Sequence, residues 1–160
     1  MIRGLVEQGR VSVTWGTGRS AVACLTDLVE PVAVLNAGVC GACKPRWSAG
    51  DEVKPSIVRA NGREEIPVAN GETGILKTVD EPVLDAESKQ ALEGDFVDME
   101  AYHLASRCLA LNVPFHCAKV VGDTLETPPL TTAVMKECRR VLPQLTISVE
   151  NAVKNLVNLV

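Results

Sequence analysis

The sequence has few aromatic side chains, and this scarcity limits what its core can contain. Aromatic residues make up 3% of the 160 residues (two Trp, one Tyr and two Phe), whereas 46% of the residues are hydrophobic. A hydrophobic core must therefore be aliphatic, built mainly from Val, Leu, Ile and Ala. A chain of this length suits one domain, and we expect residues 1–160 to form it.

The sequence also lacks an excess of basic residues and any long apolar run. It contains 16 Lys and Arg against 20 Asp and Glu, so its formal net charge is −4 and its isoelectric point is near 5.2. Because a nucleic-acid surface needs a basic patch, this balance argues against a nucleic-acid partner. No apolar run approaches the ~20 residues of a membrane span, and the start of the sequence lacks the apolar stretch of a secretory signal. We therefore expect a cytoplasmic protein with no membrane partner.

Closely spaced metal ligands are missing as well, although six cysteines are present. Most of the cysteines lie in apolar stretches, where a reduced thiol packs as a small hydrophobic group. Cys40 and Cys43 have the spacing of redox motifs, but they follow a predicted strand within a glycine-rich turn instead of opening a helix. We predict reduced, structural thiols there, with redox chemistry as the alternative. No second pair of Cys or His completes a zinc site, so we predict neither a metal nor a cofactor.

Periodicity in the rest of the chain predicts strands that alternate with helices. Alternating or apolar runs predict strands at residues 11–15, 32–36, 52–59, 75–79, 95–97 and 115–121. Helical spacing predicts helices at residues 20–29, 85–92, 100–111 and 130–160, the last broken near Pro143, and small residues predict a turn at 37–42. This alternation indicates an α/β protein with a three-layer αβα fold around a central mixed, mainly parallel sheet.

Two carboxylates stand where ligands bind in open α/β sheets. Asp123 follows the predicted strand at 115–121, and Gly122 before it allows a close approach to the backbone. Asp123 could protonate a leaving group, or it could cap the next segment. Glu100 begins a predicted helix, where its two oxygens suit the vicinal hydroxyls of a sugar. The helix dipole alone also favours an acidic residue there, so both interpretations stay open.

Four segments occur in the order seen in the purine and uridine phosphorylase superfamily. They are WGTGRSA at 15–21, LNAGVCGA at 35–42 with AGDEV at 49–53, VDMEA at 97–101, and the stretch from Val113 to Asp123. The sequence most resembles the methylthioadenosine/adenosylhomocysteine nucleosidase branch of that superfamily. The resemblance implies a nucleoside phosphorylase-like fold that lacks the usual first strand and helix. It also implies a homodimer or higher homo-oligomer.

The same resemblance implies roles for individual residues. Asp123 would donate a proton to the purine as the N-glycosidic bond breaks, and Glu100 would bind the ribose hydroxyls. The predicted substrate-binding residues are Glu100, Met99, Asp80, Val83, Gly38 and Val39. Met99 would pack beneath the sugar, and the segment from Asp80 to Val83 would line the base pocket. Hydrolysis of a purine nucleoside or a related ribosyl compound is the implied activity.

Departures from the family pattern define two alternatives. Phosphorylases carry an Arg before the glycine-rich turn, where this chain has Asn36, as hydrolases do. A phosphorylase with the same pocket is the first alternative, and Asn36 opposes it. The family's Glu that activates the attacking water belongs to leading elements, but here only Glu7 precedes Val11, and nothing around Glu7 matches that motif. A catalytically impaired nucleoside-binding or scaffold protein is the second alternative.

Overall fold

The computed structural model describes residues 6, 12–13, 16, 18–25 and 31–158. The strand predicted at 11–15 lies largely outside these residues, as do Glu7 and the end of the helix predicted at 20–29. Residues Gly18–Leu25 form a 3₁₀-helix, η1, and not the first turns of the predicted α-helix.

Seven strands among the described residues form one mixed sheet, in the order β2-β7-β1-β6-β5-β3-β4. The strands are β1 (Val34–Ala42), β2 (Glu52–Val53), β3 (Ile57–Arg59), β4 (Ile66–Pro67), β5 (Ile75–Thr78), β6 (Phe96–Asp98) and β7 (Phe115–Asp123). Parallel ladders join β1 to β7, β3 to β5 and β5 to β6. Antiparallel ladders join β1 to β6, β2 to β7 and β3 to β4. The predicted mixed sheet is confirmed.

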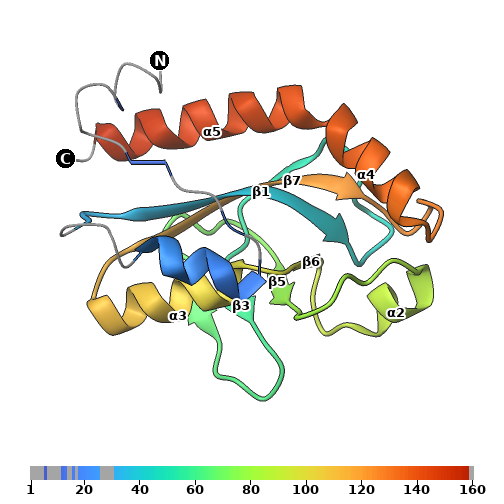
Figure 1. The fold of residues 1–160 in the computed structure, drawn as a ribbon, viewed down its shortest axis with the longest axis horizontal. Coiled ribbons are helices and arrows are strands. Elements are labelled where there is room, and N and C mark those ends of the chain that lie inside the picture. Colours follow the sequence, from blue (N-terminus) through green and yellow to red (C-terminus); the bar gives the residue numbers. More distant parts are fainter. Residues whose placement is uncertain (1–5, 7–11, 14–15, 17, 26–30, 159–160) are drawn as a thin grey trace.

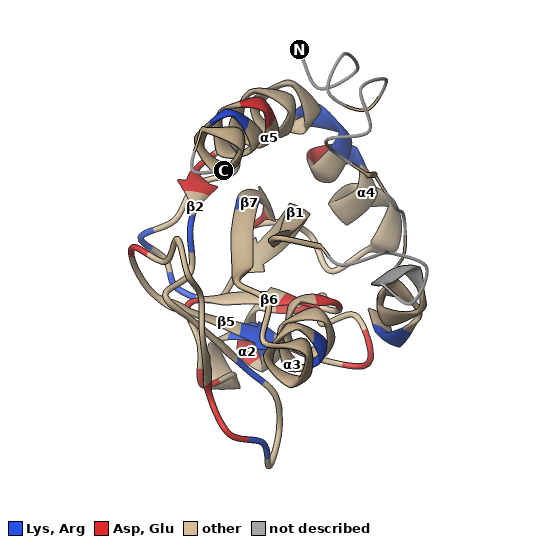
Figure 2. Ribbon diagram, turned by 90° about the vertical axis from the view of Figure 1, so that its left-hand side faces the viewer, with Lys and Arg blue, Asp and Glu red and all other residues tan. Residues whose placement is uncertain are grey.

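Helices cover both faces of this sheet (Figure 1). The helices α4 (Thr131–Arg140) and α5 (Leu142–Val157) pack on β7 from one side, while α3 (Ala101–Leu111) and η1 lie on the other (Figures 1 and 2). The short helix α2 (Ala86–Ala91) lies near the end toward which β1 and β7 point. The predicted three-layer αβα architecture is thus confirmed. None of the described helices is long and apolar enough to cross a bilayer.

The strand β1 continues through the segment predicted as a turn at 37–42. Val34–Ala42 is one nine-residue strand, so the predicted turn is wrong. The glycines in it serve packing: a Cβ on Gly41 would lie 3.0 Å from Val97 Cγ1 and 3.3 Å from both carboxylate oxygens of Asp123. Glycine in the interior of a strand can mark a close approach by a neighbour, and that is its role here.

The strand predicted at 52–59 is divided into β2 and β3. Pro55 lies between them and has no backbone N–H to donate to a sheet ladder. β2 pairs with β7, while β3 pairs with β5 toward the other edge of the sheet. The two-residue strand β4 was not predicted, because it is too short to show a period. The break between α4 and α5 falls at Val141, close to the prediction, and Pro143 is accommodated in the first turn of α5.

The core is mainly aliphatic, as the composition predicts, and it contains two buried phenylalanines, Phe96 and Phe115. Phe96 is fully buried, and its ring centroid lies 4.8 Å from that of Trp47. Cys40 and Cys43 are buried free thiols, as predicted. Burial raises the pKa of the Cys43 thiol to about 11. These two cysteines pack as small hydrophobic groups at the end of β1.

Candidate functional site

The helix α3 begins over a buried carboxylate. Asp98 ends β6, and its Oδ2 accepts a hydrogen bond from the backbone N–H of Ala101 at 3.0 Å. Its Oδ1 accepts from the Thr78 hydroxyl at 2.7 Å, and that hydroxyl accepts from the backbone N–H of Tyr102 at 2.9 Å. The N–H groups of a first helical turn have no partner within the helix. Asp98 and Thr78 accept hydrogen bonds from two of these N–H groups. These bonds fix the position of the first turn of α3 and, with it, that of Glu100.

A buried lysine of β7 connects this carboxylate to Glu100. Lys119 is 1% exposed, and its Nζ lies 3.0 Å from Asp98 Oδ2 and 3.9 Å from Glu100 Oε2. Burial lowers the pKa of Lys119, but the charges of Asp98, Cys117 and Glu100 raise it by more, so the net pKa lies above its ordinary value. Lys119 is therefore a buried ammonium. A Cβ on Gly38 of β1 would lie 3.5 Å from the Nζ of Lys119, so the backbone of β1 lies close to this ammonium.

Glu100, the predicted sugar ligand, is also bonded to η1. Its Oε1 accepts a hydrogen bond from the backbone N–H of Gly18 at 3.1 Å. The Glu100 side chain keeps 18% of its surface exposed. One of its oxygens thus faces Lys119 and the other faces the first residue of η1. A sugar diol bound to Glu100 would share its carboxylate with Lys119 and the Gly18 N–H, or would replace them.

Asp80, predicted to line a base pocket, takes part in a surface ion pair. Nε and Nη2 of Arg19 donate to its two carboxylate oxygens at 3.1 and 3.2 Å. The hydrogen bonds and charge of Arg19 lower the pKa of Asp80, and those of Asp80 raise the pKa of Arg19. Because both side chains are exposed, such a pair contributes little to stability. It does connect η1 to the segment after β5. The role of Asp80 toward a base stays a prediction.

Asp123 is paired with a lysine that sequence analysis did not single out. Asp123 as a whole residue is 7% exposed, and Lys89 of α2 is fully buried. Lys89 Nζ donates a hydrogen bond to Asp123 Oδ2 and lies 3.4 Å from the carbonyl oxygen of Thr124. No sequence pattern could have revealed Lys89, since it lies within the polar stretch AESKQA, which is typical of a solvated helix.

A β-bulge sets the position of Asp123. Cys40 stands opposite Val121, but Gly41 stands opposite Asp123, so Gly122 is an extra residue on β7. Bulges change the direction of the side chains that follow them and are frequent beside functional sites. The Asp123 carboxylate is thereby directed against Gly41, where no side chain intervenes.

The two clusters occupy separate places along β7. Lys119 and Asp123 are four residues apart, which corresponds to about 13 Å in an extended strand. Strands that all ran parallel would bring Glu100 and Asp123 to one edge of the sheet, but this reasoning fails here, because β6 runs antiparallel to β1. Among the described residues, no hydrogen bond or ion pair joins Glu100 to Asp123. That both carboxylates contact one ligand stays a prediction.

The remaining predicted residues lie around these clusters. Val83 and the adjacent Pro82 line a cavity of about 400 Å³, which Ser88 of α2 and Pro129 also line. Val39 lies half-buried in β1 and faces Gly122, while Met99 is half-buried beside Glu100. A second cavity, of about 370 Å³, is lined by Trp47, Thr124 and Thr127, with Glu137 and Arg140 from α4. The residues next to Lys89 and Asp123 in the sequence, Ser88 and Thr124, line the first and the second cavity respectively.

No protein-family model and no curated protein sequence matches the chain. Among solved structures, the nucleosidase MTAN of Chlamydia trachomatis bound to MTA superposes with a TM-score of 0.70 at 18% identity, over 87% of this chain and 74% of that one. Futalosine hydrolase of Helicobacter pylori gives a TM-score of 0.68 at 12% identity, over 86% and 72% of the two chains. The 5′-methylthioadenosine nucleosidase of Arabidopsis thaliana gives 0.61 at 22% identity, over 88% and 65%.

The chain has the nucleosidase fold. This confirms the fold that the four sequence segments predicted, and at these identities the likeness is one of fold. Among the described strands, β1 and β7 form the longest parallel pair. The two charged clusters lie along that pair.

Proposed function

We propose that the protein binds a purine nucleoside or a related ribosyl compound and hydrolyses its N-glycosidic bond. The observation that carries this proposal is the Asp123 carboxylate at the end of β7, set against Gly41 by the bulge at Gly122. It occurs in a fold shared with nucleosidases that were solved with MTA and with adenine bound.

The chemistry divides between the two clusters. As the bond between C1′ and the ring nitrogen breaks, the sugar becomes oxocarbenium-like and the electron pair moves onto the base. Asp123 is the group that protonates the leaving base: it passes on a proton from the Lys89 ammonium, which is left as a neutral amine. Water adds to C1′ and releases a proton, which restores the pair. Glu100 accepts hydrogen bonds from the ribose hydroxyls, and Met99 packs beneath the sugar.

Binding without turnover is the second candidate function, and one observation favours it. Both carboxylates are bonded to the chain's own donors, Glu100 to the Gly18 N–H and Asp123 to the Lys89 ammonium. A ligand must compete with these donors. Phosphorolysis has less support, because Asn36 offers no charge to a phosphate.

The decisive experiment follows release of the free base from inosine, adenosine and methylthioadenosine, with binding measured in parallel by calorimetry. We expect base and free sugar to appear in phosphate-free buffer. Base release that requires added phosphate would select the phosphorylase, and binding without release would select the binding protein. If none of the three compounds binds or is cleaved, the proposed function is wrong.

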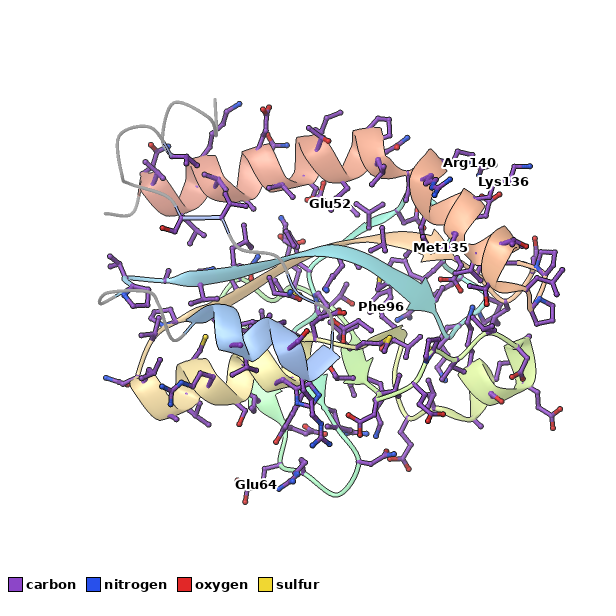
Figure 3. All side chains as sticks on the ribbon, viewed as in Figure 1. Glu52, Glu64, Phe96, Met135, Lys136 and Arg140 are labelled. Atoms are coloured by element: carbon purple, nitrogen blue, oxygen red, sulfur yellow. The ribbon has the colours of Figure 1, made fainter. Side chains whose placement is uncertain are left out.

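We further propose a cytoplasmic homo-oligomer, with a dimer as the simplest form. Exposed apolar side chains on α4 and α5 support it. Met135 of α4 is 49% exposed (Figure 3). On α5, Leu142 is 49% exposed and Ile147 is 60% exposed. Such a group of apolar side chains suits contact with a second copy. Acidic and basic residues are interspersed along the ribbon, which gives no support for a nucleic-acid partner (Figure 2). Light scattering at high concentration tests the oligomer, and a monomer there would contradict it.

A further inference from the structure

The buried ammonium of Lys119 is shared by two carboxylates that differ in exposure. Its Nζ lies 3.0 Å from Asp98 Oδ2 and 3.9 Å from Glu100 Oε2. The side chains of Lys119 and Asp98 are each 1% exposed, whereas that of Glu100 is 18% exposed. Of these three groups, only Glu100 offers surface to a ligand. Lys119 can therefore influence a bound sugar through Glu100, without touching the sugar itself.

The two ion pairs of Lys119 differ in length. The contact with Asp98 is short enough for a hydrogen bond, and Asp98 is itself bonded to the Ala101 N–H and the Thr78 hydroxyl. The ammonium thus has a fixed anchor. At 3.9 Å, the contact with Glu100 is longer than a hydrogen bond, so Oε2 keeps its lone pairs for other donors. Lys119 attracts that oxygen without occupying it.

The other oxygen of Glu100 is held by a different element. Oε1 accepts a hydrogen bond from the Gly18 N–H at 3.1 Å, so η1 fixes one oxygen while Lys119 of β7 attracts the other. A free glutamate side chain has many rotamers, and a ligand that orders one loses affinity. Here the carboxylate is oriented before a sugar arrives, with each oxygen able to accept from one hydroxyl.

We propose that Lys119 is a positioning residue for sugar recognition, which holds Glu100 Oε2 where it accepts a ribose hydroxyl. This inference rests on the proposed function and deepens it by naming the residue through which Glu100 distinguishes ribose from deoxyribose. Without the ammonium, Oε2 loses its partner. Glu100 and Asp98 then repel each other, because they lose the cation that they share. Glu100 turns away, and the hydroxyl loses its acceptor.

The test compares ribonucleosides with their 2′-deoxy and 3′-deoxy analogues by calorimetry, with adenine and with hypoxanthine as the base. In the wild type, loss of either hydroxyl should weaken binding by roughly tenfold or more, the size of a hydrogen bond to a charged group. Lys119→Met should bring at least one of these two affinity ratios close to one. Lys119→Arg keeps the positive charge and should restore part of the lost ratio.

Two further variants separate positioning from stability. The double variant Asp98→Asn/Lys119→Met removes both buried charges, so neither is left unpaired, and it should show the same loss of discrimination as Lys119→Met. Cys117→Ala removes a buried side chain of β7 two residues before Lys119. It should lower the free energy of unfolding and keep both wild-type affinity ratios.

The ratio of two affinities does not depend on how much of a variant is folded. Ratios unchanged in Lys119→Met and in the double variant overturn the role of Lys119 and leave the proposed function standing. Higher ratios also overturn it, because they show that the ammonium competes with the sugar. If the wild type binds none of these nucleosides, the inference fails. The proposed function fails with it if methylthioadenosine is not bound either.

Discussion

Asp123 has two tasks in the proposed site, and one substitution separates them. Asp123→Asn keeps the shape and can still hydrogen-bond, but it cannot act as a carboxylic acid. We expect most turnover to be lost while nucleoside binding is retained. Because Lys89 then stays buried without its anionic partner, the free energy of unfolding should fall by about 3–5 kcal/mol. Turnover number, dissociation constant and urea unfolding measure these effects. Full turnover in Asp123→Asn would contradict the mechanism.

Glu100 should behave differently, because its contacts with sugar hydroxyls exist before and during bond cleavage. Glu100→Ala removes charge-assisted hydrogen bonds, each worth about 1.5–3 kcal/mol, so affinity and kcat/KM should fall together by about ten- to a hundredfold. Steady-state kinetics beside calorimetry measure both. Glu100→Gln serves as the control that keeps the size of the side chain. A fall in kcat alone would argue against sugar binding by Glu100.

Between elements, the packing of α4 on β7 depends on the absence of a side chain at Gly122. A Cβ there would lie 2.8 Å from Cys138 Sγ and 3.3 Å from Val39 Cβ. Gly122→Ala should therefore push α4 away and destabilise the protein by about 1–3 kcal/mol, the usual effect of overpacking. Urea unfolding measures the loss.

A second substitution tests this contact directly. Cys138→Ala removes the sulfur that a Cβ on Gly122 would meet, so the double variant should recover part of the lost stability. Cys138→Ala alone is the control. Additive losses in the double variant would show that the strain arises elsewhere.

Across the whole molecule, buried thiols should make stability depend on alkaline pH. Burial raises the pKa of Cys43 and Cys108 to about 11 and that of Cys117 to about 12, against about 8.5 for an ordinary thiol. A raised pKa in the folded state means that the unfolded chain loses these protons first. The stabilisation is thus complete below about pH 8.5 and is lost as pH rises toward the folded values.

Unfolding free energies measured at several pH values between 8 and 11 check this expectation. Cys117→Ala should reduce the slope of stability against pH, whereas changing the half-buried Cys138 should reduce it less. A slope that Cys117→Ala leaves unchanged would contradict the role of the buried thiols.

The sequence by itself determined the layered architecture and the order of most elements. Apolar periodicity located β5, β6, β7 and α3 to within a few residues, because each buries one face or both and its pattern shows this locally. Composition predicted the aliphatic core. Four short segments in order predicted the nucleosidase fold, and they located Asp123 and Glu100 next to the ends of β7 and β6.

Only the tertiary structure decided how these parts meet. The direction of β6 against β1 and the continuation of β1 through its glycines depend on neighbours distant in the sequence. The burial of Lys89 has the same cause: a lysine in a polar helix is normally solvated, and it turns inward here because Asp123 meets it from β7. Local patterns record which face of an element is buried. They do not record which charged residue will lie against that face. Lys89 and Asp123 are 34 positions apart in the sequence, so only folding brings them together.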